Sequence, residues 1–290
     1  MNDDSPMQGK TVLITGGNSG IGRETAAGLA RLGATVAITS RDREKGQRAA
    51  AEVGAQSGRQ VECLHLDLAS LASVRSLAAD FLQRYDELHV LINNAGLILG
   101  DRRLTDDGFE MTFGVNHLGH FLLTDLLLDR IKASAPARII NVSSRAHRRV
   151  PEGLDFDDLQ AEKSYRGLQV YSRSKLANVY FTRELARRLE GAGVTVNALH
   201  PGGVATGFAR DGDVKGLYGW LVRLASPFLK TPEQGARTSI YVASAPELEG
   251  VSGKYFSDSK ETEPAPAALD DEAAKRLWAA SEELIARAGA

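Results

Sequence analysis

Short runs of apolar and β-branched residues alternate along the chain with longer segments in which apolar residues recur three and four positions apart. The short runs predict seven strands, at residues 11–15, 35–40, 61–66, 89–93, 138–142, 194–199 and 254–256. The longer segments predict amphipathic helices, and in one of them Leu71, Val74, Leu77 and Phe81 share a face. The early strands are almost continuously apolar, as expected when helices cover both faces of a parallel sheet. The pattern therefore predicts an α/β fold: a doubly wound sheet of about seven mostly parallel strands with helices on both faces.

No linker, low-complexity tract or internal repeat divides the chain, so we expect residues 1–290 to form a single Rossmann-type domain that closes with a helix over 269–288. Residues 205–230 depart from the alternation, because a Gly-rich polar stretch gives way to an apolar cluster between Leu217 and Leu229. We expect a substrate lid there, since binding pockets are largely apolar and loops at this edge of the sheet move. A subunit interface and a membrane-surface helix are the alternatives.

Composition and charge exclude several classes of protein. Lys and Arg total 35 against 37 Asp and Glu, a net charge of −2, so no basic field exists to hold a nucleic-acid backbone. The single cysteine, Cys63, allows neither an intrachain disulfide nor a zinc framework. The chain starts with a polar, acidic stretch, and its apolar runs fall far short of the ~20 residues of a membrane span. We therefore expect a cytoplasmic protein that has no integral membrane segment and binds neither metal nor nucleic acid.

The first predicted strand ends in TGGNSGIG, which places Gly16, Gly20 and Gly22 at a strand-to-helix turn. Glycine is required there if a pyrophosphate is to reach the backbone amides at the positive end of the helix, because a side chain would block it. Structural turns are also rich in glycine. A strand before the turn, a helix after it and another strand at Thr35 favour a dinucleotide site.

Tyr171 and Lys175 lie four residues apart in a predicted helix and therefore share a face. A phenol with a pKa near 10 is a poor acid or base at neutral pH, unless an ammonium within ~4–6 Å stabilises its phenolate. Many amphipathic helices carry such a pair by chance. Downstream of a nucleotide turn, the pair indicates that Tyr171 performs acid/base chemistry.

The GxxxGxG spacing, with NNAG at 93–96 and the Tyr–Lys pair, resembles the short-chain dehydrogenase/reductase family. Segments such as GVNHLGHFLLTDLLLDRIKASAPARIINVSSRAH, SKLANVYFTRELARRL and SGKYFSDSK resemble its retinol dehydrogenase subgroup, whose members reduce retinal and other lipophilic aldehydes with NADPH. We expect the protein to lack the membrane anchor that usually precedes the glycine turn in that subgroup, and Ser40 stands where the subgroup often has Cys. As the substrate, another hydrophobic carbonyl compound is therefore at least as well supported as a retinoid. The oligomeric states common in this family imply a homodimer or homotetramer, although the subgroup includes monomers.

The resemblance implies a catalytic set of Asn116, Ser144, Tyr171 and Lys175. In this family the second serine of the NVSS motif (residues 141–144) hydrogen-bonds the reacting carbonyl. This selects Ser144, with Ser143 as the alternative. The family pattern marks Asn116 as the residue that breaks its helix locally and holds a water that passes protons to the lysine. His117 and His120 have no carboxylate partner in the motif, and we expect both to be packing residues.

The resemblance also implies a cofactor site made of Gly16, Asn18, Ser19, Gly20, Ile21, Gly22, Arg41, Asp67, Leu68, Asn93, Ala95, Gly96, Tyr171, Lys175, Pro201, Gly202, Val204 and Thr206. An NAD enzyme would place an acid at the end of the second strand, whereas a 2′-phosphate needs a cation. Ser40 stands at that position and Arg41 follows it, which favours NADP over NAD. The alternative is that Arg41 is solvated and Asp42 binds the ribose.

These observations predict an NADP(H)-dependent oxidoreductase that transfers a hydride between the nicotinamide and the carbonyl or alcohol carbon of a small lipophilic substrate, such as an aldehyde, a ketone or a retinoid-like molecule. In the reducing direction Tyr171 would donate the proton, and Lys175 would also hold the nicotinamide ribose. The alternative from another class is a non-catalytic dinucleotide-sensing regulator on the same fold. Such a protein should have lost the tyrosine or the lysine, and both are present.

Overall fold

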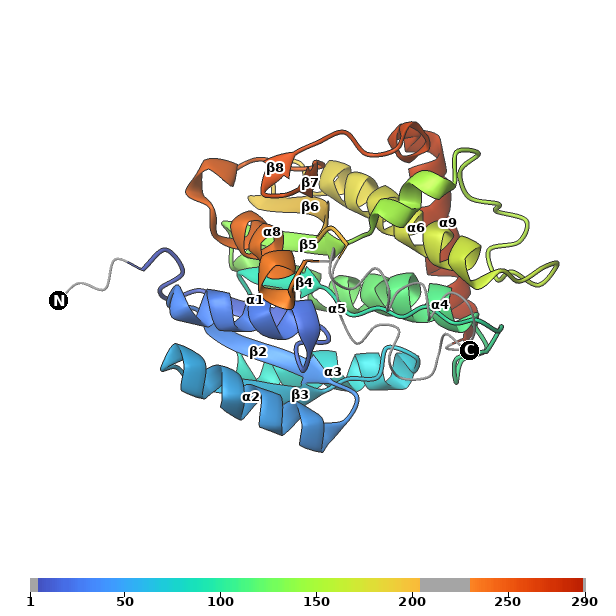
Figure 1. Cartoon of the computed structure of the whole chain (residues 1–290). Coiled ribbons are helices and arrows are strands. Elements are labelled where there is room, and N and C mark those ends of the chain that lie inside the picture. The colour runs from blue at the N-terminus through green and yellow to red at the C-terminus, as the bar shows by residue number, and fades with distance from the viewer. Residues whose placement is uncertain (1–4, 204–229, 289–290) are drawn as a thin grey trace.

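The computed structural model of the protein describes residues 5–203 and 230–288, and an eight-stranded sheet lies at its centre (Figure 1). The strands lie in the order β3-β2-β1-β4-β5-β6-β7-β8. The first seven pair in parallel, and β8 pairs antiparallel with β7. Their bounds are β1 (Thr11–Ile14), β2 (Thr35–Ser40), β3 (Val61–His65), β4 (Val90–Asn93), β5 (Ala137–Val142), β6 (Val194–His200), β7 (Tyr255–Ser257) and β8 (Lys260–Glu261).

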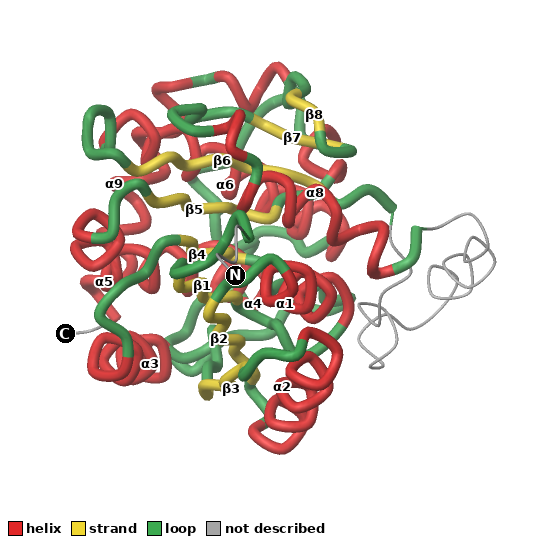
Figure 2. Tube along the Cα trace, turned by 90° about the vertical axis from the view of Figure 1, so that its left-hand side faces the viewer, coloured by secondary structure: helices red, strands yellow, loops and turns green. Residues whose placement is uncertain are grey.

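Helices cover both faces of the sheet, as Figure 2 shows end-on. One face carries α1 (Gly20–Arg31), α2 (Arg43–Ser57) and α8 (Pro232–Ser244). The other carries α3 (Leu71–Arg84), α5 (Gly119–Ala133) and α6 (Gly167–Arg188), with α9 (Asp271–Ala288) packed on α6. Among the described residues, the shorter helical segments are α4 (Met111–Phe113), a π-helix (Gly114–Leu118) and three 3₁₀ segments (Arg145–Arg149, Pro246–Leu248 and Pro266–Leu269).

The side chains of each central strand alternate between two apolar cores, one on each face of the sheet. In β1, Val12 and Ile14 belong to the core under α1 and α8, whereas Leu13 belongs to the core under α3, α5 and α6. All of β1 is buried, so an apolar residue on either face removes surface from water, which stabilises the fold by about 25 cal/mol per Å². Burial on both faces explains why these strands show no polar alternation in the sequence.

Each of the seven predicted strands is present, with both ends within one residue of the prediction. The prediction of about seven strands is one short, because it misses the two-residue strand β8. A tight turn at Asp258 and Ser259, with φ of 52° and 57°, returns the chain from β7 to β8. A strand of two exposed residues, Lys260 and Glu261, has no apolar periodicity, and the turn lacks the glycine that usually marks such hairpins.

The C-terminal helix closes the face formed by α5 and α6. Trp278 packs edge-on against Phe121, with ring centroids 4.8 Å apart, and also against Phe181, at 5.8 Å. Its indole N–H donates to the carboxylate of Glu282 over 2.8 Å. The helix begins at Asp271, two residues later than predicted, because Pro266–Leu269 forms a 3₁₀ turn.

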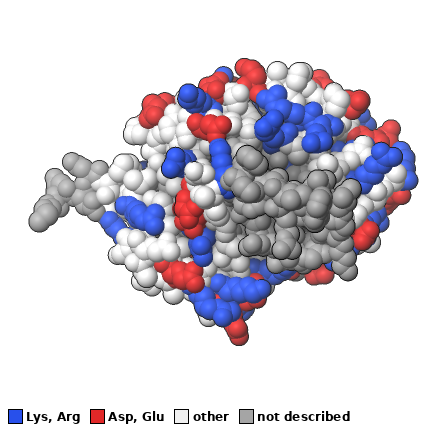
Figure 3. Space-filling model, in the orientation of Figure 1, with Lys and Arg blue, Asp and Glu red and all other residues white. Residues whose placement is uncertain are grey.

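The predicted substrate lid at 205–230 lies outside the described residues, apart from Lys230, so the lid and the single-domain organisation of the whole chain stay predictions. Within residues 5–203 and 230–288, no helix combines the length and apolar character needed to cross a bilayer. On the face shown in Figure 3, basic and acidic side chains are interspersed.

Candidate active site

A cleft of about 670 Å³ opens at the carboxyl ends of the central strands, where doubly wound sheets bind their ligands. The loops that follow β1 to β6 all contribute to its wall. It brings together most of the residues that the sequence singled out. These are Gly16, Asn18, Ser19, Gly20, Ile21, Gly22, Arg41, Asp67, Leu68, Ala95, Gly96, Ser144, Tyr171, Lys175, Pro201 and Gly202.

Two predicted residues, Asn93 and Asn116, do not line the cleft, and Val204 and Thr206 lie outside the described residues. Among the lining residues that the sequence analysis does not single out, Asn94 belongs to the NNAG motif and could have been found there. Leu66, Leu97, Ile98 and Val115 add apolar surface, and no local signal separates them from core residues. The others are Thr39, Lys45 and Val142.

The glycine turn has the shape that a phosphate-binding turn requires. Gly16 has φ of +66°, and a Cβ added to Gly22 would lie 2.4 Å from the carbonyl oxygen of Gly16. Ser19 caps α1 without a side-chain hydrogen bond, and the first turn of the helix contains no acidic residue. The amides at this helix end therefore remain available to an anion, and the turn fits the pyrophosphate of a dinucleotide.

Thr15 ties the glycine turn to the end of β4. Its hydroxyl oxygen accepts hydrogen bonds from the main-chain N–H groups of Asn94 (2.9 Å) and Ala95 (3.0 Å). The Asn94 side chain in turn donates to the carbonyl oxygen of Thr15 over 2.8 Å. Asn93 points away from the cleft, because successive side chains of a strand alternate. Its amide donates to Thr124 on α5 and to Asn141 on β5. Asn94 and Ala95, rather than Asn93, therefore face the cleft.

The end of β2 bears on the choice between the two dinucleotides. Asp42 is the N-cap of α2, since its carboxylate accepts the N–H of Lys45 over 3.0 Å, and its pKa is lowered chiefly by that bond. Its second carboxylate oxygen lies 3.7 Å from Nζ of Lys45. Arg41 is exposed at the wall of the cleft. Arg23, just past the glycines, pairs with Glu24 and Glu52.

Tyr171 and Lys175 both face the cleft from α6, as their spacing predicted. Nζ of Lys175 lies 5.7 Å from the centre of the Tyr171 ring and donates to the carbonyl oxygen of Val142 over 3.0 Å. The amine is buried, and burial lowers its pKa to about 8. Lys175 therefore combines a positive charge near neutral pH with a fixed position beside the phenol.

Asn116 lies behind the cleft wall in the π-helix Gly114–Leu118, which interrupts the path from α4 to α5. Its side chain forms a paired contact with the backbone of Leu97: Oδ1 accepts the N–H (2.8 Å) and Nδ2 donates to the carbonyl oxygen (2.9 Å). Nδ2 also donates to the hydroxyl of Ser174 on α6. A Cβ added to Gly96 would lie 3.2 Å from Oδ1 of Asn116 and 3.3 Å from Nζ of Lys175, so these groups converge on one point.

A buried carboxylate starts the helical segment that carries Asn116. The two oxygens of Glu110 accept the N–H groups of Thr112 (2.9 Å) and Phe113 (2.7 Å). We expect Glu110→Gln to lower the free energy of unfolding by about 1–3 kcal/mol, because the amide can accept only one of these bonds and turns a donor toward the other. Urea unfolding measures this. Glu44→Gln, at an exposed ion pair, should change stability by less than about 0.5 kcal/mol, and an equal loss in both variants would refute the capping role.

Ser144 follows β5 and lines the cleft opposite α6. Its hydroxyl oxygen accepts the N–H of Ala146 over 3.1 Å, which leaves the hydroxyl proton to be donated elsewhere. Ser143 also lines the cleft, but its hydroxyl donates to the carbonyl oxygen of Lys175 over 2.7 Å. Of the two serines, Ser144 is thus the one whose proton is available to a bound molecule.

His117 and His120 are buried among packing contacts, as expected. Nε2 of His117 lies 2.8 Å from the hydroxyl of Ser281 on α9, and its ring packs against Phe113. His120 lies 2.8 Å from the hydroxyl of Thr15. Burial lowers the pKa of each histidine to about 3, so both are uncharged at neutral pH.

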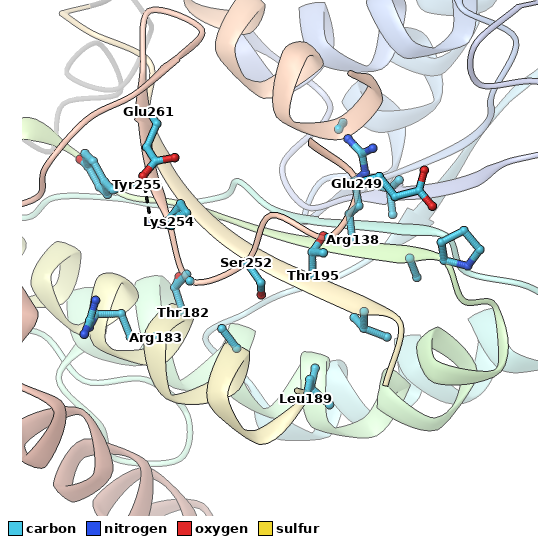
Figure 4. Close-up of a pocket in the computed structure, with 18 of the residues that line it drawn as sticks. Arg138, Thr182, Arg183, Leu189, Thr195, Glu249, Ser252, Lys254, Tyr255 and Glu261 are labelled. Atoms are coloured by element: carbon cyan, nitrogen blue, oxygen red, sulfur yellow. Dashed lines mark ion pairs between the residues drawn. The ribbon is translucent and has the colours of Figure 1, made fainter. Parts of the chain in front are cut away.

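A larger cavity of about 940 Å³ lies at the opposite, amino end of the strands (Figure 4). Several of its charged side chains already have partners. Arg138 donates to the carbonyl oxygens of Val242 and Ala245, and Lys254 lies 3.1 Å from Glu261. Neither the glycine turn nor the Tyr–Lys pair reaches it. The smaller cleft is therefore the candidate active site.

Known proteins are similar to this chain in both sequence and fold. The sequence model of the short chain dehydrogenase family matches residues 10–155 and 158–214. Retinol dehydrogenase 14 of Homo sapiens is 52% identical over 298 residues, which cover 98% of this chain and 88% of that protein. An uncharacterised protein from Mycobacterium paratuberculosis has 37% identity, a TM-score of 0.76, and coverage of 97% of this chain and 95% of its own.

Structures of this fold have been solved with either dinucleotide. The RhlG/NADP complex of Pseudomonas aeruginosa has a TM-score of 0.70 and 27% identity, and covers 88% of this chain and 97% of its own. The structure of a 3-ketoacyl-(acyl-carrier-protein) reductase from Brucella melitensis was solved with NADH. It has a TM-score of 0.66 and 25% identity, and the match covers 86% of this chain and 96% of that reductase. The chain belongs to the short-chain dehydrogenase family, within its retinol dehydrogenase subgroup, and is an oxidoreductase that acts on CH–OH and C=O groups.

Proposed function

We propose that the protein is an NADP(H)-dependent oxidoreductase whose substrates are lipophilic carbonyl compounds or alcohols, with Tyr171 as its acid/base and Ser144, Lys175 and Asn116 as its partners. One observation carries this proposal: the buried ammonium of Lys175 and the ring of Tyr171 share a cleft with a glycine turn that fits a pyrophosphate. The bound nicotinamide would supply or accept the hydride.

Residues of the cleft would supply the proton that carbonyl reduction adds to the substrate oxygen. In carbonyl reduction, negative charge develops on the substrate oxygen, and the hydroxyl groups of Ser144 and Tyr171 would donate hydrogen bonds to it. Tyr171 would then transfer its proton, because the nearby charge of Lys175 stabilises the resulting phenolate. The buried side chain of Asn116 holds the backbone of Leu97 and thereby the wall on which Lys175 converges. In alcohol oxidation the same groups would act in reverse.

Apolar side chains support a lipophilic substrate. Leu97, Ile98 and Val115 line the cleft beside the Tyr–Lys pair, and a substrate that covers them removes apolar surface from water. The test is a panel of medium and long aliphatic aldehydes, quinones, steroids and retinal, with NADPH and NADH oxidation followed in parallel. Turnover of several lipophilic carbonyls with NADPH would support the proposal. Binding of the dinucleotide without turnover of any compound would instead favour a regulatory protein.

The preference for NADP rests on the end of β2. The carboxylate of Asp42 is engaged at the N-terminus of α2, whereas Arg41 is exposed at the cleft wall and can take a phosphate. We expect Arg41→Ala to raise KM for NADPH about 10- to 100-fold, equivalent to one charged hydrogen bond, and to change KM for NADH by less than about threefold. Arg43→Ala, outside the cleft, is the matched control. Equal increases for both dinucleotides would contradict a 2′-phosphate contact.

The buried amine predicts the pH dependence of reduction. Because burial lowers the pKa of Lys175 to about 8, the ammonium is present below that pH and is lost above it. We expect kcat/KM for NADPH-dependent reduction to be flat below pH 8 and to fall by about tenfold per unit well above it. Initial rates between pH 6 and about 10, at saturating NADPH and at aldehyde concentrations well below KM, test this. A profile that rises through pH 8 would show that the neutral amine is the active form.

A further inference from the structure

A buried cluster of three side chains, His147, Tyr255 and His200, lies behind Ser144 and has no role in the mechanism above. His147 belongs to the 3₁₀ segment that follows Ser144, Tyr255 begins β7, and His200 ends β6 just before Pro201. The Tyr255 ring centre lies 5.0 Å from that of His147 and 5.6 Å from that of His200. The cluster thus joins two loops that line the cleft, one carrying Ser144 and the other Pro201.

The contacts of His147 determine which of its nitrogens carries the proton. The main-chain N–H of Ala265 can only donate, and it points at Nε2 of His147 over 2.9 Å. Nε2 is therefore the unprotonated acceptor, and Nδ1 carries the hydrogen. Nδ1–H donates to the carbonyl oxygen of Ser144 over 2.6 Å. Burial also lowers the pKa of His147, in keeping with a neutral ring.

Tyr255 and His200 hold this ring from the side of the sheet. The Tyr255 oxygen lies 3.3 Å from Nδ1 of His147 and 3.0 Å from Nδ1 of His200. The one hydrogen on Nδ1 of His147 points chiefly at the Ser144 carbonyl and is shared with the Tyr255 oxygen, which accepts there and can give its own proton to His200. Nε2 of His200 then donates to the hydroxyl of Ser257 over 3.1 Å. Every polar atom of the cluster thereby has a partner.

The carbonyl group of Ser144 is the point at which this cluster reaches the active site. That oxygen accepts both the ring N–H of His147 and the main-chain N–H of the same residue, the second over 3.1 Å. Two donors on one carbonyl fix the orientation of the peptide that follows Ser144, and hence the direction of its side chain.

We propose that His147 is a positioning residue, which through the Ser144 carbonyl aims the Ser144 hydroxyl at the reacting oxygen, and that Tyr255 and His200 support its ring. This inference rests on the proposed function, because it gives His147 an effect only where Ser144 binds substrate. It predicts that the ring N–H toward Ser144 matters for turnover, whereas the contact with Ala265 matters only for stability.

Two substitutions separate these contacts. His147→Asn places an amide N–H near the position of Nδ1 and keeps the donor to Ser144, whereas His147→Gln places a carbonyl oxygen near Nε2 and keeps the acceptor for Ala265. His147→Asn loses the hydrogen bond from Ala265, and His147→Gln loses the bond to Ser144 and the longer contact with Tyr255, so both variants should melt at a lower temperature than the wild type. We expect kcat for aldehyde reduction to fall about 10- to 100-fold in His147→Gln and less than about threefold in His147→Asn, with KM for NADPH unchanged in both. Equal losses of kcat in the two variants would overturn the proposal.

A double-mutant cycle with Ser144→Ala provides the second test. If His147 acts through Ser144, His147→Gln should cause no further loss of kcat in the Ser144→Ala background, and multiplied losses would overturn the proposal. Should the His147 variants not fold, Tyr255→Phe, which removes only a hydroxyl, is expected to lower kcat by about three- to tenfold in the native background and not at all beside Ser144→Ala. An effect in both backgrounds would again overturn it. Failure of the proposed function is recognised separately, since wild type and Tyr171→Phe would then turn over aldehydes equally.

Discussion

Tyr171→Phe is expected to lower kcat for carbonyl reduction by about 10²- to 10⁴-fold, the range found when a general acid is removed, while Kd for NADPH changes by less than about twofold. The substitution removes only a hydroxyl, and the ring remains beside the Lys175 ammonium, which lies 5.7 Å from its centre. Binding of the dinucleotide depends mainly on other parts of the cleft. Stopped-flow absorbance at saturating aldehyde gives kcat, and quenching of protein fluorescence gives Kd.

Tyr241→Phe is the matched control for this variant. Tyr241 lies on α8 and packs against Phe256, outside the cleft, so its loss of a hydroxyl should leave turnover unchanged. If Tyr171→Phe retained the turnover of the wild type, the acid/base role would be wrong and another donor would have to be sought among the cleft residues. A loss of both turnover and NADPH binding would assign the phenol to the cofactor site rather than to proton transfer.

Gly22→Ala is expected to weaken NADPH binding by at least about 100-fold and to lower the free energy of unfolding by about 1–3 kcal/mol. The added Cβ would lie 2.4 Å from the carbonyl oxygen of Gly16 and 2.6 Å from Nδ2 of Asn94. A backbone oxygen cannot turn aside as a flexible side chain can, so the whole turn must move, and with it the amides that face the phosphates. Isothermal titration with NADPH and urea unfolding measure the two effects.

Gly58→Ala separates loss of stability from loss of binding. Gly58 caps α2 with φ of +70°, and an added methyl group would meet no atom within 4 Å. This variant should lose about 1–2 kcal/mol of stability through backbone strain alone and bind NADPH as the wild type does. If Gly22→Ala bound NADPH equally well, the turn would not be the phosphate site.

The local parts of the active site could be predicted from the sequence because each depends on residues close together in the chain. Tyr171 and Lys175 share a face by helical spacing alone, and both line the cleft. The glycine turn is recognisable because the strand, the turn and α1 follow one another directly. The resemblance in sequence supplied the further expectation that Ser144 joins them at the same edge of the sheet.

Other assignments depended on which way a side chain points, and the local pattern does not settle that. Asn93 and Asn94 are chemically identical neighbours, and only the folded structure shows that Asn94 faces the cleft while Asn93, the last residue of β4, bonds to Thr124 and Asn141. Likewise, only the start of α2 shows that the carboxylate of Asp42, a candidate partner for a ribose, accepts the N–H of Lys45. Charge and residue type were known in both cases, but the available hydrogen bonds were not.

From the amino-acid sequence alone one could predict the doubly wound architecture, the ends of seven strands to within one residue, and the pairing of a phenol with an amine one helical turn away. These follow from periodicity and from contacts between residues near one another in the chain. The folded chain was needed to show the π-helix that holds Asn116 against Leu97, the hairpin to β8, and the contact between Ala265 and His147 behind Ser144. Such contacts depend on how the whole chain packs, because their free energy comes from residues that are distant in sequence, and no short segment includes both partners.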